Sequence, residues 1–147
     1  FGYVTLRRPT SDREPLRRFE RLHAAVAGSL GVPIAHLLEA HDWLAARDDA
    51  ALATHAFTVA PDVTEERHYW PGDDHPAAMN LRQGSGFART VPVGTAVAAV
   101  VGACDGTLPV GAICAAVADL LEVDADALAA EVLPELRELI LTGMLLV

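Results

Sequence analysis

The chain has 147 residues, of which 52% are hydrophobic and only 5% aromatic, so its core must be built mostly from Ala, Leu and Val. The formal net charge of −9 is unevenly distributed: residues 1–21 carry six Arg against three acidic residues, whereas the remainder carries five Arg against seventeen. From Cys104 onward there are eight acidic residues and one base, Arg137. A nucleic-acid reader needs a basic face to neutralise phosphates, so this balance argues against DNA or RNA binding by this part.

The composition also disfavours membrane and secreted proteins. No apolar run reaches the ~20 residues that cross a bilayer, and residues 1–8 lack the basic-then-apolar plan of a signal peptide. Cys104 and Cys114 lie in apolar helical contexts without a His or Cys at metal-ligand spacing, which indicates reduced, buried thiols. We therefore expect a soluble, cytoplasmic protein with no membrane partner.

The N-terminal residues predict a strand. Phe1–Pro9 alternates β-branched and aromatic residues and ends at a proline. A strand needs neighbours with which to pair, so residues 1–9 suggest a fragment whose N-terminal partner has been removed. The next apolar segment, Leu16–Ala27, has spacing that favours a helix, although an irregular strand also fits it.

Two helices are expected before the middle of the chain. The first begins at Val32 or Pro33 and ends at Arg47. Asp48-Asp49 then caps a short helix through Leu52.

The middle of the chain predicts a small, antiparallel sheet. Its four expected strands are His55–Ala60, Val63–Trp70, Met79–Gln83 and Phe87–Val93. The last two flank Gly84-Ser85-Gly86, whose composition is typical of a hairpin turn.

Residues 94–147 begin with a helix–turn–helix pattern. An apolar helical run from Ala96 to Cys104 stops at Asp105-Gly106, a pair that favours a turn with positive φ at the glycine. Thr107 is expected to cap the next helix, with Pro109 in its first turn. Its buried stripe is predicted to contain Ile113, Val117, Leu120 and Leu121.

A longer helix and a strand complete the chain. Asp124 caps the helix from about Ala125, and Thr142-Gly143 ends it. Its apolar face consists of Leu128, Val132, Leu136, Leu139 and Ile140. Residues 144–147 are left as a short apolar strand. Helix, turn, helix, longer helix and strand is the order of a winged helix.

The sequence therefore predicts an α+β fold, in which a small antiparallel sheet with helices precedes a C-terminal winged-helix-like bundle. Three regions are expected: the truncated strand at 1–9, an α+β linker and sheet region at 10–93, and the winged-helix-like domain at 94–147.

The chain resembles the C-terminal region of class I S-adenosylmethionine-dependent methyltransferases of an actinobacterial type, related to the small-methyltransferase and protein-glutamine methyltransferase families. The resemblance covers most of the chain. Its segments are Phe1–Pro9, His41–Ala50, Val63–Arg67, Pro71-Gly72, Leu81–Gln83 and Val100–Gly106. It departs from the family at Ala88-Arg89, where an arginine pair is usual.

This resemblance implies a parent protein that transfers a methyl group from S-adenosylmethionine. No Gly-rich turn for that cofactor and no Asn-Pro-Pro-Tyr-type motif is present in these residues. The chain alone is thus expected to hold no cofactor and no catalytic residue, and to recognise a protein or peptide substrate or to dimerise. Its first partner would be the upstream methyltransferase domain.

Two alternatives stay open at this point. The stretch from Cys104 to Ile113 is also similar to the turn of PqqD-like peptide-binding winged helices, which implies an adaptor with an exposed strand edge for β-augmentation. A winged-helix transcriptional regulator is the third hypothesis, and the acidic balance argues against it.

Candidate recognition residues flank the Gly-Ser-Gly turn. Arg82, Gln83 and Arg89 can grip an anionic or amide group, because Arg offers a bidentate fork. The alternative is a solvated hairpin whose arginines pair with nearby acids. Tyr69 and Trp70 either mark a contact surface or cover the underside of the sheet.

Two further candidates are weaker on chemical grounds. Asp105 is either a recognition residue or a turn-forming residue before Gly106. A polar cluster lacks a helix to fix the spacing that a metal site needs, and exposed strand charges explain it equally well. That cluster contains Glu65, Glu66, His68, Asp73, Asp74 and His75. No metal is expected.

Overall fold

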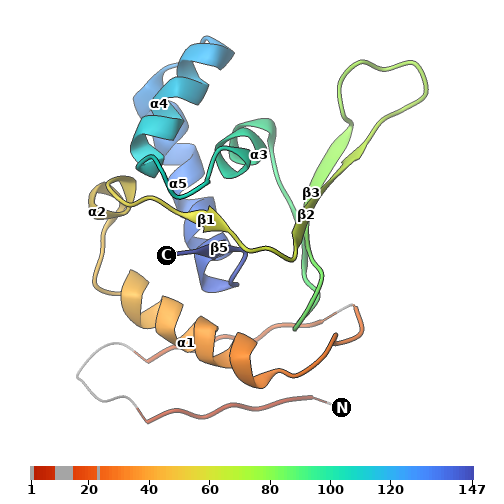
Figure 1. Cartoon of the computed structure of the whole chain (residues 1–147), viewed down its shortest axis with the longest axis vertical. Helices are drawn as coiled ribbons and strands as arrows, with labels where there is room; N and C mark the ends of the chain where they lie inside the picture. Colours follow the sequence, from red (N-terminus) through yellow and green to blue (C-terminus); the bar gives the residue numbers. More distant parts are fainter. Residues whose placement is uncertain (1, 9–14, 23) are drawn as a thin grey trace.

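The computed structural model describes residues 2–8, 15–22 and 24–147 (Figure 1). The fold is α+β, as predicted: helices are combined with small antiparallel sheets. In chain order the elements are α1 (Gly31–Leu44), α2 (Asp49–Ala53), β1 (Thr58–Val59), β2 (Val63–His68), β3 (Ala78–Gln83), β4 (Thr90–Pro92), α3 (Thr95–Gly102), α4 (Val110–Leu121), α5 (Ala125–Leu141) and β5 (Leu145–Leu146).

The helix α5 forms as its sequence predicts. The Asp124 side chain accepts a hydrogen bond of 2.8 Å from the Ala127 amide and so caps the first turn. All five residues of the predicted apolar face are buried. Gly143, with φ of 75°, follows the helix and turns the chain into β5.

The start of α4 differs from the prediction. Asp105-Gly106 forms the expected turn, with φ of 85° at the glycine. Thr107 does not cap the helix, because its hydroxyl donates to the Asp105 carboxylate instead. Pro109 takes the cap position without a side-chain hydrogen bond.

The predicted stripe of α4 is only half correct. Ile113 and Val117 are buried, together with Val110, Cys114 and Ala118. Leu120 is 78% and Leu121 38% exposed. Val123, which follows the helix, is 52% exposed, so the apolar side chains at the end of α4 stay outside the core.

Two separate antiparallel sheets organise the strands. One has the order β2-β3-β4, and the other pairs β1 with the C-terminal β5 through Thr58↔Leu146 and Val59↔Leu145. Figure 1 shows that β2 and β3 form an arm which projects from the body and ends in the loop 69–77. Because side chains alternate along a strand, Met79, Leu81 and Gln83 of β3 are all buried on one face.

One apolar core joins the chain from Leu52 onward, and Ala40, Trp43 and Leu44 of α1 pack against its edge. It contains Leu52 and Phe57, the inner face of β3, and the facing sides of α3, α4, α5 and β5. Within the described residues, no helix has the length and hydrophobicity to cross a membrane.

The prediction of a helix over Leu16–Ala27 is wrong. The described residues of this segment form no helix, and Ala27 instead pairs with Gly86 through two backbone hydrogen bonds of 2.9 and 2.7 Å. An amphipathic helix is stable only where its apolar face is covered, and Phe19 at the centre of the segment is 98% exposed. Residues 2–8 also form no strand among the described part of the chain, so their pairing with an upstream domain stays a prediction.

Candidate functional site

The structure brings two of the three predicted hairpin residues together and separates the third. Gln83 at the end of β3 lies opposite Arg89, the residue before β4. The backbone amide of Gln83 donates a hydrogen bond of 2.9 Å to the backbone carbonyl of Arg89. Both side chains are buried, each with 8% of its residue surface exposed. Arg82 points to the opposite face of β3 and pairs with Glu66 at 3.1 Å, as the solvated-hairpin alternative predicted.

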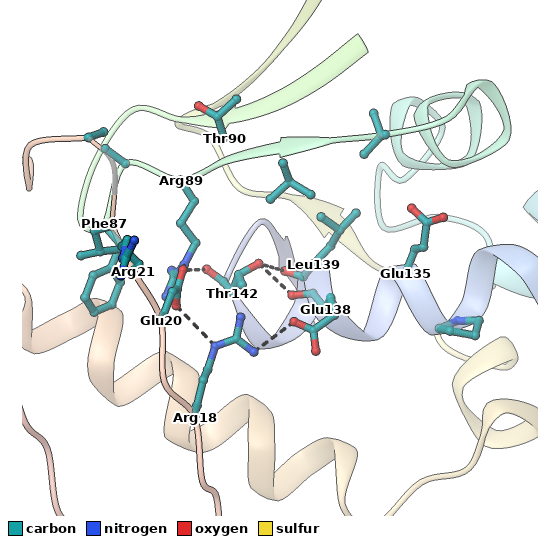
Figure 2. Close-up of a pocket in the computed structure, with 16 residues that line it drawn as sticks. Arg18, Glu20, Arg21, Phe87, Arg89, Thr90, Glu135, Glu138, Leu139 and Thr142 are labelled. Carbon is teal, nitrogen blue, oxygen red and sulfur yellow. Dashed lines mark hydrogen bonds and ion pairs between the residues drawn. The ribbon is translucent and has the colours of Figure 1, made fainter. Parts of the chain in front are cut away.

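Arg89 is the centre of an ion-pair network (Figure 2). Its guanidinium donates two hydrogen bonds to the Glu20 carboxylate, at 2.6 and 2.9 Å. A third, of 3.3 Å, reaches the Thr142 carbonyl at the end of α5, and the Phe87 ring centre lies 4.3 Å from the guanidinium carbon. This bidentate geometry holds the pKa of Glu20 below its ordinary value, chiefly through the hydrogen bonds from Arg89.

Arg18 extends the network to α5. Its guanidinium lies 3.0 Å from Glu138 and 3.4 Å from Glu20. Figure 2 shows Arg18 between the two carboxylates, so positive and negative groups alternate from the hairpin to the helix. Each of the four groups, Arg89, Glu20, Arg18 and Glu138, has a neighbour of opposite charge, and this attraction offsets the hydration that a charged group loses on partial burial.

Gln83 is only half satisfied. Its amide nitrogen donates to the Thr142 carbonyl at 3.0 Å, the same oxygen that Arg89 contacts. Its buried Oε1 atom has no hydrogen-bond partner in the described part of the chain. An unpaired buried oxygen is costly, which makes the end of α5 a point where an additional donor would be favourable.

A groove of about 550 Å³ opens beside this network, between residues 18–22 and Ala24, the hairpin and the C-terminal half of α5. Its apolar lining includes Val91, Val93 and Leu139. Arg21 and Glu135 also line it, and neither has an ion-pair partner in the part that the structure describes. The groove thus offers an apolar floor and, as far as the described residues go, a positive and a negative charge without partners.

Asp105 stabilises the turn in which it lies. One carboxylate oxygen accepts from the Thr107 amide at 2.9 Å and from the Thr107 hydroxyl at 2.6 Å. These hydrogen bonds lower the pKa of Asp105. The turn-forming interpretation explains the residue without a ligand.

Tyr69 and Trp70 lie just after β2, in the loop at the end of the arm. They are 50% and 69% exposed and do not cover the underside of the sheet. Neither residue lines the groove beside Arg89, because both lie in the loop between β2 and β3. They remain a candidate contact surface of their own.

No metal centre is formed by the described residues, which bring no three His, Cys, Asp or Glu side chains into a ligating group. Cys104 and Cys114 are free and buried. Burial raises the pKa of both thiols, that of Cys104 to about 11. A thiol with so high a pKa is a poor nucleophile at neutral pH.

Sequence reasoning identified Gln83 and Arg89 but missed Arg18, Glu20, Glu138 and Thr142. Glu20 is 69 residues from Arg89 in the chain. The only local signal was charge, because residues 1–21 are rich in Arg while most acidic residues lie elsewhere. Nothing in that pattern indicates which pairs form.

The comparison with known families covers most of this architecture. Residues 35–147 match the family described as "Domain of unknown function (DUF7782)". The chain belongs to this family. Gln83, Arg89, Glu138 and Thr142 lie within the matched residues, whereas Arg18 and Glu20 lie before them. No curated protein matches the chain.

Proposed function

We propose that this chain is the non-catalytic C-terminal part of an S-adenosylmethionine-dependent methyltransferase of the cytoplasm, and that the groove beside Arg89 holds a peptide segment of its protein substrate. The observation that carries the binding role is the groove itself, which is open and has an apolar floor. It also carries two charges, Arg21 and Glu135, that have no ion-pair partner among the described residues. The link to methyl transfer rests on the resemblance of Phe1–Pro9, Leu81–Gln83 and Val100–Gly106.

A peptide suits this groove for chemical reasons. Ligand sites combine apolar walls with a few polar groups that fix orientation. Here Val91, Val93 and Leu139 would contact aliphatic side chains, while Arg21 and Glu135 would pair with charged side chains of either sign. Arg89 is fully engaged with Glu20 and Thr142, so its role is to fix the wall rather than to touch the substrate.

The first test is a calorimetric titration of S-adenosylmethionine into this chain and into its full parent protein. Binding by the parent alone is expected, because the cofactor site would lie upstream of Phe1. Binding by the 147-residue chain would overturn the non-catalytic role. Binding by neither would overturn the methyltransferase origin.

The second test addresses the groove. Glu135→Arg reverses one unpaired charge in the groove, whereas Glu131→Arg makes the same change on α5 outside it. The labelled chain is applied to an array of short synthetic peptides. We expect Glu135→Arg to weaken binding of Lys- and Arg-containing peptides and Glu131→Arg to leave the pattern unchanged. Equal effects of the two variants would reject the groove as the binding site.

A PqqD-like peptide-binding adaptor is the second candidate. It is favoured by β5, which packs beside α5 and has β1 as its one partner strand in the described chain. A free edge next to a helix is the feature that β-augmentation uses. The genomic reading frame separates the two candidates: an upstream methyltransferase region supports the first, and a start codon close to Phe1 supports the second.

A further inference from the structure

The strand β4 leaves one edge of its sheet free in the described part of the chain. It is the last strand in the order β2-β3-β4. Arg89, just before β4, accepts a backbone hydrogen bond of 2.9 Å from Gln83 of β3. Val93, just after β4, donates one of 3.0 Å to Met79. Because backbone groups alternate in direction along an antiparallel strand, residues 89, 91 and 93 direct theirs toward β3.

Thr90 and Pro92 therefore direct their backbone groups away from the sheet. This outer edge offers one amide, that of Thr90, and the carbonyls of both residues, because proline has no N–H group. None of these groups forms a backbone hydrogen bond with another residue that the structure describes. Figure 2 shows the side chains of Thr90 and Arg89 on opposite sides of the strand. Thr90 still lines the groove, which indicates that its backbone borders it.

The groove beside this edge is apolar along its middle and charged toward its two ends. Val91 and Val93 lie on the same face of β4 and line the groove together with Leu139 of α5. In Figure 2, Arg21 lies near the start of β4 and Glu135 lies toward its end. Neither charge has an ion-pair partner within the described ranges. The two charges thus give the groove a direction.

We propose that the groove binds its peptide as an additional strand, antiparallel to β4, and selects a segment with a basic, an aliphatic and an acidic residue at alternate positions from its N-terminus to its C-terminus. This inference rests on the part of the proposed function that places a peptide in the groove, and it does not use the link to methyl transfer. Strand addition at a sheet edge takes affinity from backbone hydrogen bonds and specificity from alternate side chains.

The register of the bound peptide follows from the free groups. One peptide residue lies opposite Thr90 and exchanges two hydrogen bonds with it. The residue two positions earlier donates its amide to the Pro92 carbonyl. Antiparallel pairing places the N-terminal end of the peptide beside Glu135 and its C-terminal end beside Arg21. The side chain between these ends lies next to Val91 and contacts the apolar floor.

Methylation of single peptide nitrogens tests the backbone pairing. The probe is a fluorescein-labelled peptide, Arg-Thr-Val-Thr-Glu between glycines, whose dissociation constant from the 147-residue chain is measured by fluorescence anisotropy. A methyl group on the nitrogen of its second threonine removes the donor to the Thr90 carbonyl, so binding should weaken at least about tenfold. The valine nitrogen points away from β4 in this register. Its methylation is the matched control and should weaken binding less than about threefold.

Two substitutions at one position test the same edge from the side of the protein. Thr90→Pro removes the edge amide without removing a hydrogen bond to β3, so binding of the probe should weaken about tenfold. Thr90→Val keeps the amide and should leave the dissociation constant within about twofold. Thermal unfolding checks that both variants fold. The two methylated peptides need no variant, so they decide the question even if Thr90→Pro unfolds.

A reversed peptide tests the direction of binding. Glu-Thr-Val-Thr-Arg has the same composition as the probe, but antiparallel pairing would place its acidic end beside Glu135 and its basic end beside Arg21. We expect it to bind the wild-type chain at least about fivefold more weakly than the probe, because both ends then meet a like charge. Equal or tighter binding of the reversed peptide would overturn the antiparallel direction.

The outcomes separate this inference from the proposed function. A probe that Glu135→Arg weakens, but that loses affinity equally with either methyl group, keeps the groove and overturns the strand edge alone. The same holds if other peptides of the array bind in the groove and the probe does not. If the chain binds no peptide, the groove and the strand edge are both overturned. Binding of S-adenosylmethionine by the 147-residue chain would overturn the non-catalytic role and leave the pairing with β4 intact.

Discussion

The part of the chain before Leu52 and the part from Leu52 onward differ in what attaches them to the rest of the molecule. In the later part, apolar side chains of α3, α4, α5 and β5 interlock, and Leu136, Val132 and Val110 have no exposed surface. In the earlier part no described residue is fully buried: Ala40, Trp43 and Leu44 of α1 pack against the edge of the core. The extended residues before α1 are attached by polar contacts instead, such as the Glu20–Arg89 ion pair to the later part and the Arg7–Asp42 ion pair to α1.

The difference matters because the two kinds of attachment respond to different conditions. Burial of apolar surface contributes about 25 cal/mol per Å² and does not depend on pH. Ion pairs contribute less where they are exposed, and they weaken with salt and at low pH. We therefore expect residues 2–8 and 15–22 to detach before the core unfolds, and substitutions in both parts test this division.

The largest effect is expected in the core. Leu136→Ala removes a side chain with no exposed surface and leaves a cavity, so it should lower the free energy of unfolding by about 2–5 kcal/mol. Leu6→Ala removes the same atoms from a residue that is 91% exposed, so it should change the free energy of unfolding by less than about 0.5 kcal/mol. Urea unfolding followed by circular dichroism measures both. Similar losses would show that residues 2–8 belong to the core after all.

The next effect concerns the ion pair between Glu20 in the earlier part and Arg89 in the later part. Glu20→Ala leaves the buried Arg89 guanidinium without its carboxylate and should cost about 1–3 kcal/mol. Glu39→Ala removes an exposed carboxylate of α1 and should cost less than about 0.5 kcal/mol. In the double variant with Arg89→Met the loss should be smaller than the sum of the single losses, because no buried charge is then left unpaired.

The same pair predicts a dependence on pH. Because the folded pKa of Glu20 lies below its ordinary value of 4.5, its contribution to stability is complete above that value. The contribution is lost as pH falls through the lowered folded pKa. The stability difference between the wild type and Glu20→Gln should therefore be constant from neutral pH to about 5 and shrink below it. A difference that grows on acidification would contradict the pairing.

Gly86 tests the backbone contact between the two parts. Its φ is 60°, and a Cβ at this position would lie 2.7 Å from the Pro33 Cγ atom at the start of α1. Gly86→Ala should therefore cost about 1–2 kcal/mol. Gly102→Ala, in α3 with open space around it, should stabilise the protein by about 0.5 kcal/mol or more. Thermal unfolding compares the two, and equal effects would mean that α1 shifts freely away from Gly86.

The contrast between the two parts also explains what the sequence predicts well. In α5, the cap at Asp124 and the spacing of Leu128, Val132 and Leu136 are local patterns. The core buries these three side chains on one face, so packing stabilises the same helix that the local pattern predicts. Leu16–Ala27 has a similar apolar spacing, yet its Phe19 is 98% exposed and none of its described residues is fully buried. The ion pairs of Glu20 and the Ala27–Gly86 bridge hold the described residues in an extended backbone instead. Periodicity predicts a helix only when tertiary packing uses the period.

For the site, the sequence predicts which residue types gather at the hairpin but not what they bind. Arg89 was predicted either to grip an anionic or amide group of a substrate or to pair with an acidic residue of the chain, and it pairs with Glu20. The choice of that partner depends on how a segment 69 residues away crosses the hairpin, which no local pattern encodes. Gln83 similarly reaches Thr142 only because α5 ends beside β3.

The smallest effect is expected at the pair that fixes the first run to α1. The hydrogen bonds from Arg7 are the main cause that lowers the pKa of Asp42 to about 2, so the pair persists at all but very acidic pH and is lost as pH falls through that value. Asp42→Asn weakens it at neutral pH without touching the core. Urea unfolding should therefore be unchanged, while residues 2–8 exchange their amides several-fold faster. Asp73→Asn, in the loop of the arm, should alter neither measurement. If Asp42→Asn instead lowers the urea midpoint and leaves exchange of residues 2–8 unaltered, Asp42 supports α1 itself, and the first run is held by other contacts.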